Sequence, residues 1–243
     1  MTYRHAVTAR DHQDLASGSV LHSAPGFPAF PVRLASEIFQ RALALRGGDH
    51  PATLWDPCCG SGYLLTVTAL LHRTRIAAVL ACDLDPDAVG LAGRNLALLT
   101  RAGLHARAAD LRERAARFGK PAYTDAAHAA RRLADALQAA GGDLPHAARQ
   151  ADVFDPAQLR QAIAGHVPDI AITDVPYGEQ AHWRGPSAAA GVTGMVEALT
   201  TVLPRGGVLA VTVRGRKVVV DGHRPDASFK IGTRAVALFR TPA

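Results

Sequence analysis

The sequence has few of the residues that build disulfide frameworks, metal sites and membrane spans. Its three cysteines, Cys58, Cys59 and Cys82, form no Cys-x-x-Cys pair and stand at no zinc-ligand spacing from a histidine. Such a count suits a reducing compartment and predicts no metal site. No apolar run approaches the roughly 18 residues of a transmembrane helix, and the N-terminus lacks the apolar core of a signal peptide. We therefore expect a cytoplasmic protein with no membrane partner.

Lysine is also scarce, although the chain is basic. The formal net charge is +6, and lysine supplies only Lys120, Lys217 and Lys230. The positive charge is therefore almost all arginine, whose planar guanidinium makes bidentate contacts with phosphate groups. A nucleic-acid partner and a plain compositional bias toward alanine and arginine explain this charge equally well.

A glycine turn is the feature around which the rest of the chain is organised. It lies in the stretch LWDPCCGSGYLL, where Asp56 ends an apolar strand and Gly60 and Gly62 let the backbone bend and approach a ligand closely. The stretch lacks the lysine and the following serine or threonine of a phosphate-binding loop, which disfavours a nucleoside triphosphate. It also lacks the third glycine of the dinucleotide-binding fingerprint.

Acidic residues follow the turn at two further expected strands. The apolar run IAAVLACDL ends in Asp83 and Leu84, and Asp83 stands 21 residues after Gly62. This is close to the spacing at which a Rossmann-type fold places a carboxylate against ribose hydroxyls. A later unit, QADVFDP, carries Asp152 and Val153. Acids thus end or follow several expected strands, at the edge where doubly wound sheets bind ligands.

The segment PDIAITDVPYG adds a fourth expected strand with a distinctive end. Its apolar run leads into Asp174, Val175, Pro176 and Tyr177, which hold a carboxylate, a proline and an aromatic ring together. Such a tetrapeptide also occurs in ordinary turns. Its place after a buried strand, as the fourth element of the series, favours a functional interpretation.

An alanine- and arginine-rich stretch at 103–147 delays the third expected strand. A doubly wound sheet normally places its next strand about 20 to 25 residues after Asp83, because βα connections are short. We interpret the delay as a helical insertion. Its basic surface consists of Arg112, Arg114, Arg117, Arg131 and Arg132. A solvated helix face with no partner is the equally weighted alternative.

The two ends of the chain complete the expected domain. Residues 32–45 show helical spacing after a proline-rich loop, and Gly47 and Gly48 end the pattern. Near the other end, LPRGGVLAVTV is expected to form the fifth strand. The β-branched runs RGRKVVV and TRAVALFR are expected to be the closing strands, the last one antiparallel.

The motifs DPCCGSG, ACDLDP, QADVFD, TDVPYG and LPRGG stand in the order found in class I S-adenosylmethionine-dependent methyltransferases, which the chain resembles over residues 30–240. The resemblance implies a Rossmann-like α/β fold: a mostly parallel, doubly wound sheet with an antiparallel final strand and the helical insertion. Residues 1–50 would cover the cofactor site or simply pack there, and 51–243 would form the methyltransferase domain. The cofactor implied is S-adenosyl-L-methionine. Its implied contacts are Asp56, Cys58, Gly60, Gly62, Asp83, Leu84, Asp152, Val153 and Asp174.

TDVPYG is similar to the (D/N)PPY motif of methyltransferases that modify base nitrogens, which implies Asp174, Pro176 and Tyr177 as catalytic residues. The whole chain also resembles the avilamycin-resistance methyltransferases, which act on a guanine of large-subunit ribosomal RNA. Val175 replaces the first proline of the motif, so we favour ring N1 over the exocyclic N2 as the methyl acceptor. RNA contacts are expected from Arg131, Arg132, Trp183, Arg184, Arg214, Arg216 and Lys217.

Other functions stay open on the sequence alone. A nicotinamide-dependent oxidoreductase would use Asp83 but leaves TDVPYG without a role. Pro57 and Cys58 resemble the Pro-Cys pair of cysteine-nucleophile base methyltransferases, yet they lie inside the glycine turn. A noncatalytic RNA-binding module would explain the arginines and leave the cofactor motifs unused. A methyltransferase acting on another nucleic acid or on a small substrate is a further alternative.

Overall fold

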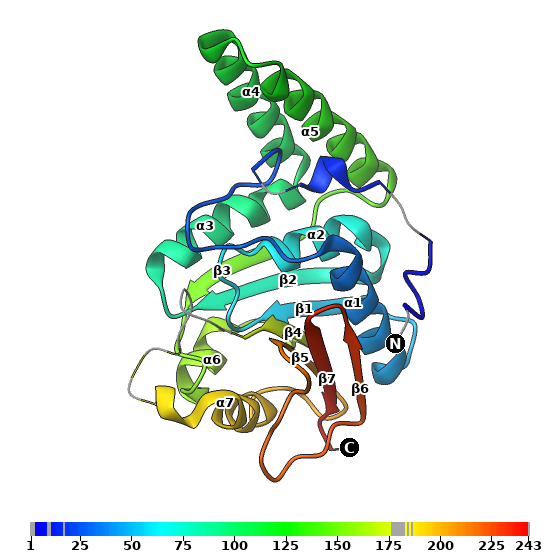
Figure 1. Cartoon of the computed structure of the whole chain (residues 1–243), viewed down its shortest axis with the longest axis vertical. Helices are drawn as coiled ribbons and strands as arrows, with labels where there is room; N and C mark the ends of the chain where they lie inside the picture. The colour runs from blue at the N-terminus through cyan, green and yellow to red at the C-terminus, as the bar shows by residue number, and fades with distance from the viewer. Residues whose placement is uncertain are drawn as a thin grey trace.

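The computed structural model describes residues 3–8, 11–16, 18–175, 183, 185 and 187–242. In this part of the chain, seven strands form one sheet in the order β3-β2-β1-β4-β5-β7-β6 (Figure 1). The strands are β1 (Ala52–Asp56), β2 (Ile76–Asp83), β3 (His146–Gln150), β4 (Ile170–Asp174), β5 (Val208–Arg214), β6 (Ala227–Ile231) and β7 (Arg234–Arg240). Neighbours from β3 to β5 run parallel, whereas β7 is antiparallel to both β5 and β6. The expected mostly parallel sheet with an antiparallel final strand is confirmed.

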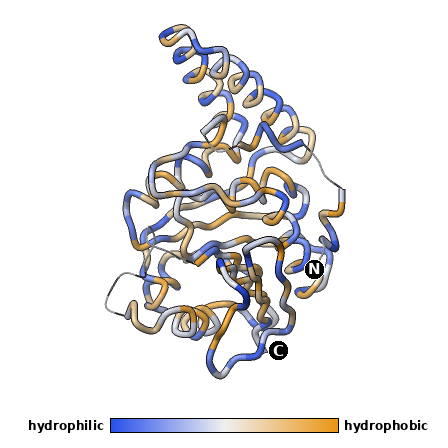
Figure 2. Tube along the Cα trace, viewed as in Figure 1, coloured by the Kyte–Doolittle hydropathy of each residue, from blue (hydrophilic) through white to orange (hydrophobic). Residues whose placement is uncertain are grey.

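Helices cover both faces of the sheet. One face packs against α1 (Val32–Arg46), α2 (Tyr63–Leu71) and α3 (Pro86–Leu96), and the other against α6 (Pro156–Ala162) and α7 (Gly191–Thr200). Successive strand residues enter opposite cores, so Leu54 packs on the first face and Trp55 on the second. Figure 2 shows the resulting hydrophobic strands inside a more polar periphery. Short 3-10 helices lie at Gln13–Leu15, Arg73–Arg75, Ala97–Leu99 and Ala188–Ala190.

A long helical hairpin projects from the sheet domain (Figure 1). It consists of α4 (Arg101–Phe118) and α5 (Pro121–Ala139), and β3 begins only after it. The side chain of Thr100 caps α4 by accepting the Gly103 N–H at 3.0 Å. The hairpin occupies the stretch in which the sequence predicts a helical insertion. No helix in the described residues is long and apolar enough to cross a membrane.

The expectation that residues 214–220 form a closing strand is wrong. β5 ends at Arg214, and β7 pairs with β5 along its whole length. The outer position belongs to β6, which starts at Ala227. Val218 and Val220 are instead buried in the second core from a segment outside any strand. Their β-branched pattern therefore reflects burial of a loop.

The N-terminal segment is fastened to α1 by one buried carboxylate. Glu37 accepts hydrogen bonds from the backbone N–H groups of Arg4, His5 and Ala6 and from the Arg41 guanidinium. Burial disfavours the charged carboxylate, but these donors outweigh it and lower the pKa of Glu37 to about 2. The segment ahead of α1 is thereby held against the domain.

Candidate active site

A cavity of about 860 Å³ opens at the carboxyl ends of the central parallel strands. The chain leaves β1 toward α2 on one face of the sheet and leaves β4 toward α7 on the other. Because β1 and β4 are neighbours, the strand order reverses between them. Doubly wound sheets bind ligands at this reversal point, and the cavity volume lies within the usual range of ligand sites.

Hydrogen bonds hold the glycine turn against the end of β2. The Gly60 N–H donates to Asp83 Oδ2 at 2.8 Å, and the Cys58 N–H donates to Asp56 Oδ1 at 3.0 Å. The second oxygen of Asp83 accepts the N–H of Asp85, the residue that caps α3. One carboxylate therefore joins the turn after β1 to the start of α3, and the floor of the cavity is fixed by backbone donors.

The cavity is rich in carboxylates that repel one another. Asp56 is only 2% exposed. Burial raises the pKa of Asp56 to about 8, and the nearby carboxylates of Asp83 and Asp174 add to the effect. Burial likewise raises the pKa of Asp83. A cation in the cavity would relieve both the repulsion and the cost of burial, so the site suits a positively charged ligand.

Asp174 is paired with an arginine from the last strand. Arg234 Nη2 lies 3.1 Å from Asp174 Oδ2, and both side chains are largely shielded from solvent. The guanidinium also stands over the ring of Phe30, with its carbon 4.7 Å from the ring centroid. Arg234 begins β7, whose antiparallel pairing sets it opposite Arg214 on β5. The pair fixes the carboxylate of Asp174 at the cavity wall.

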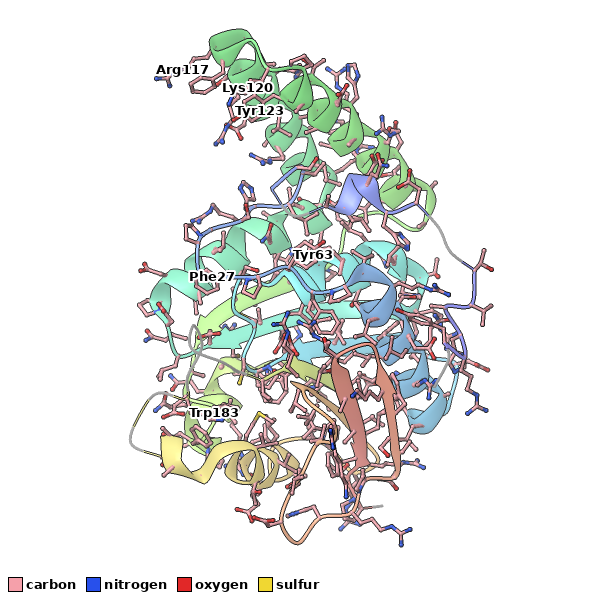
Figure 3. All side chains as sticks on the ribbon, in the orientation of Figure 1. Phe27, Tyr63, Arg117, Lys120, Tyr123 and Trp183 are labelled. Atoms are coloured by element: carbon pink, nitrogen blue, oxygen red, sulfur yellow. The ribbon has the colours of Figure 1, made fainter. Side chains whose placement is uncertain are left out.

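Aromatic side chains flank the strand ends on both sides. Phe27 and Tyr63 lie on one side and Trp183 on the other (Figure 3). The Trp183 ring packs edge-on against Phe154, with centroids 5.2 Å apart. Gly185 follows so closely that a Cβ there would come within 3.0 Å of Asp152 Oδ2. The loop after β4 therefore reaches the segment that follows β3.

Most of the residues singled out by the sequence line the cavity: Asp56, Cys58, Gly60, Asp83, Leu84, Asp152, Val153, Asp174, Trp183 and Arg214. Gly62 lies behind this lining, at the start of α2. Pro176, Tyr177 and Arg184 fall outside the described residues. Among the described side chains, no cluster of three His, Cys, Asp or Glu is placed to hold a metal ion.

The expected RNA contacts divide between the cavity and the surface. Arg131 and Arg132 are exposed on α5, and Arg132 donates two hydrogen bonds to Asp14. Arg216 and Lys217 are exposed just after β5. The structure does not bring these four residues into the lining of the cavity.

Sequence reasoning missed Arg234 and the aromatic residues of the N-terminal loop. Phe27 and Phe30 line the cavity although they precede the glycine turn by about thirty residues of sequence. Arg234 reaches Asp174 across the antiparallel edge of the sheet. No spacing of residues along the sequence predicts that Arg234 or these aromatic residues would reach the cavity. Only the position of β7 beside β5 could have pointed to Arg234.

The reversed strand order, the antiparallel last strand and the row of carboxylates along the strand ends together define a class I methyltransferase. The family model described as rRNA methyltransferase AviRa matches residues 1–234. The chain belongs to the AviRa family of rRNA methyltransferases. This membership excludes the oxidoreductase and the noncatalytic RNA-binding module that the sequence left open.

Relatives and solved structures from Streptomyces viridochromogenes agree with this assignment. The chain is 57% identical over 238 residues to a 23S rRNA (guanine(2535)-N(1))-methyltransferase, and the match covers 98% of this chain and 95% of that protein. Two solved structures of the rRNA methyltransferase aviRa have a TM-score of 0.93 and cover 99% of this chain and 97% of theirs. Their identities to this chain are 54% and 56%.

Gly62 is the residue of the turn least able to carry a side chain. Its φ is +70°, and a Cβ there would lie 3.0 Å from both Cα and Cβ of Ala92 in α3. We expect Gly62→Ala to destabilise the protein by about 1 to 3 kcal/mol through overpacking, beyond roughly 1 to 2 kcal/mol of backbone strain. Thermal unfolding followed by circular dichroism measures the total loss of stability.

Gly26→Ala is the matched control for this substitution. Its φ is +85°, but nothing lies within 4 Å of the added Cβ, so it carries the backbone strain alone. Equal losses of stability in the two variants would show that the turn and α3 are not tightly packed.

Proposed function

We propose that this enzyme transfers a methyl group from S-adenosyl-L-methionine to N1 of a guanine in 23S ribosomal RNA. The observation that carries the proposal is the convergence of Asp56, Asp83, Asp152 and Asp174 on one cavity. The activity named for the relative from Streptomyces viridochromogenes is of the same kind. We also propose that the enzyme works in the cytoplasm and protects its host from avilamycin-type antibiotics.

The cavity residues fit the proposed cofactor from end to end. Asp56 and the glycine turn would hold the methionine end, because a buried carboxylate there can pair with the α-ammonium group. Asp83 would accept the ribose hydroxyls, since each of its oxygens accepts a backbone N–H and keeps a lone pair. Asp152 and Val153 would face the adenine. Bound cofactor supplies an electrophilic methyl group next to the base pocket.

The base pocket is proposed to lie between Asp174, Arg234 and the Phe154–Trp183 pair. A stacked guanine must first leave its stack, at a cost of a few kcal/mol, and an aromatic face partly offsets that cost. Asp174 accepts the N1–H as general base, which leaves the N1 lone pair in the ring plane for the methyl group. Arg234 donates to guanine O6, where negative charge develops as the proton leaves. Pro176 and Tyr177 stay proposed members of this pocket.

The insertion is proposed to give a second RNA contact at its free end. Figure 3 shows Arg117, Lys120 and Tyr123 at the tip of the hairpin. Phe118 is 52% exposed there, with its ring 6.1 Å from that of Tyr123 and 5.1 Å from the Arg117 guanidinium. Exposed rings among cations are typical of surfaces on which unpaired bases stack. Arg131, Arg132, Arg214, Arg216 and Lys217 stay proposed phosphate contacts.

Mapping the methyl group tests the proposal as a whole. The protein is incubated with 23S ribosomal RNA and S-adenosyl-L-methionine, and the digested RNA is analysed by mass spectrometry. We expect one 1-methylguanosine, because Asp174 is proposed to take the N1–H proton while Arg234 holds the neighbouring O6. A 2-methylguanosine would overturn the choice of N1, and methylation of another base would overturn the guanine assignment.

Cofactor binding should release a proton near neutral pH. In the free protein the pKa of Asp56 is about 8, so the carboxyl is mostly protonated at pH 7. An ammonium group beside it favours the carboxylate, so binding lowers this pKa and expels up to one proton. Affinity should therefore rise as pH increases toward 8. Calorimetry in two buffers of different ionisation enthalpy measures the release.

Asp56→Asn serves as the control for that experiment, because an amide has no proton to lose in this range. It should bind the cofactor more weakly and without buffer dependence. Proton release that persists in Asp56→Asn would assign the linkage to another group.

Asp174→Asn tests the chemical step. The substitution keeps the shape and the bond from Arg234 but removes the charge, so turnover should fall by roughly 10² to 10⁴ if Asp174 acts as a base. Cofactor affinity should change little. Asp49→Asn, an exposed position before the amino end of β1, is the matched control and should turn over normally. Near-normal turnover in Asp174→Asn would confine that residue to positioning the base.

A further inference from the structure

A second cavity, of about 290 Å³, lies between the N-terminal loop, α3 and α4. Its lining consists of Gly18, Leu21, His22, Ser23, Leu91, Arg94, Arg107 and Arg114. Three arginines from two helices thus face one small space, and no acidic residue is among these described lining residues. Figure 1 shows the N-terminal segment crossing α3 at the base of the hairpin before it reaches α1.

Arg107 builds the wall of this arginine pocket. Its buried guanidinium donates to the backbone carbonyls of Val20 at 2.8 Å and Ser19 at 2.9 Å, and it also pairs with Asp110. These bonds use all three of its nitrogens. Arg107 therefore holds the loop in place and contributes positive charge to the pocket, while three of its five N–H donors are used within the protein.

Arg94 and Arg114 supply the free donors. Arg114 uses only Nε, which donates to Asp110 at 2.9 Å, so its terminal nitrogens have no partner among the described residues. The Arg94 guanidinium is exposed and makes no hydrogen bond within the described part of the chain. Three guanidinium groups face a single neutralising carboxylate, that of Asp110. The pocket keeps an excess of positive charge and two sets of unused N–H groups.

The pKa of His22 responds to the positive charge in the arginine pocket. Burial, followed by the charges of Arg107, Arg94 and Arg114, lowers the pKa of His22 to about 4 against the opposing effect of Asp110. The imidazole is therefore neutral at pH 7. Burial disfavours any charge here, but the positive charge of the three arginines, which also disfavours a proton on this ring, favours an anion at the same place.

A buried asparagine joins the pocket to the active site. Asn95 accepts the His22 N–H at 2.8 Å and donates to the carbonyls of His22 at 3.0 Å and Ser61 at 2.8 Å. Ser61 stands between the two glycines of the active-site turn. The loop then continues directly into residues 25–30, which line the active site. The two cavities consequently have a fixed offset and one continuous wall.

We propose that the arginine pocket binds one backbone phosphate of the RNA substrate, with Arg94 and Arg114 as direct ligands; this rests on the proposed function. A phosphodiester offers two charged oxygens, which match the paired donors of a guanidinium. Because the loop runs from this pocket to the active site, one strand of RNA can occupy both. The fixed offset then selects which nucleotide reaches Asp174.

The test measures RNA affinity as a function of salt. The probe is a transcript of the 23S RNA segment around the guanine that the wild-type enzyme methylates, titrated at several KCl concentrations. The Arg94→Ala variant should lose one phosphate contact. It should bind the transcript about 10-fold or more weakly, and the slope of log affinity against log salt concentration should become shallower by roughly 0.7 to 0.9. Arg94→Ala/Arg114→Ala should weaken it further. Melting temperatures check that each variant is folded.

Arg75→Ala is the matched control, since Arg75 is exposed before the amino end of β2, at the opposite edge of the sheet. It should keep the wild-type affinity and slope. Unchanged affinity and slope in the double variant would overturn the inference. Wild-type protein that neither binds nor methylates the transcript would instead overturn the proposed function, and the inference with it.

Nuclear magnetic resonance of His22 separates RNA from a free anion. Bound phosphate should raise the pKa of His22, so the transcript should shift its titration in the wild type and not in Arg94→Ala. A shift produced by inorganic phosphate or pyrophosphate but not by the transcript would make this a free-anion site and would overturn the assignment to RNA.

Discussion

The crowding of carboxylates at one edge of the sheet is the constraint on which the site depends. Parallel strands end at the same edge, so Asp56, Asp83 and Asp174 are brought together whatever their distance in sequence. Each would lose hydration and repel the others without local compensation. Backbone N–H groups compensate Asp83 and partly compensate Asp56, and an arginine compensates Asp174. Asp56 is the carboxylate whose burial is least compensated by hydrogen bonds or opposite charge. It is therefore the natural partner for a cationic group.

The uneven compensation of the carboxylates gives the two ends of the cavity different electrostatic character. The end of the cavity at Asp56 gains from an added positive charge, whereas the end at Asp174 already holds the Arg234 guanidinium. The proposed cationic cofactor and the proposed guanine, which becomes transiently anionic, would therefore occupy opposite ends of the cavity. The placement follows from β7 lying beside β5, because the antiparallel pairing sets Arg234 two residues beyond the end of β4 in the sheet register.

Local sequence predicts the acidic residues well because each is adjacent to the end of its own strand. Glycines at 60 and 62 mark the turn, and Asp83 follows an unbroken apolar run. The same local signals failed at Val218 and Val220, where burial of a loop imitates a strand. Arg234 and Asn95 escaped prediction for a different reason. Their partners lie on elements distant in sequence, and only the folded arrangement brings them together.

The arginines of this basic chain serve different purposes, and their contacts in the structure distinguish them. Arg46 pairs with Asp169, Arg132 with Asp14 and Arg234 with Asp174, so part of the positive charge is spent within the fold. Such pairs add little to affinity for a polyanion, since their charge is already compensated. An arginine contributes most where it exceeds its local carboxylates, and Arg94 and Arg114 meet that condition around a single aspartate. Net charge alone therefore overstates the surface available to RNA, and the local imbalance of charge is the better guide to it.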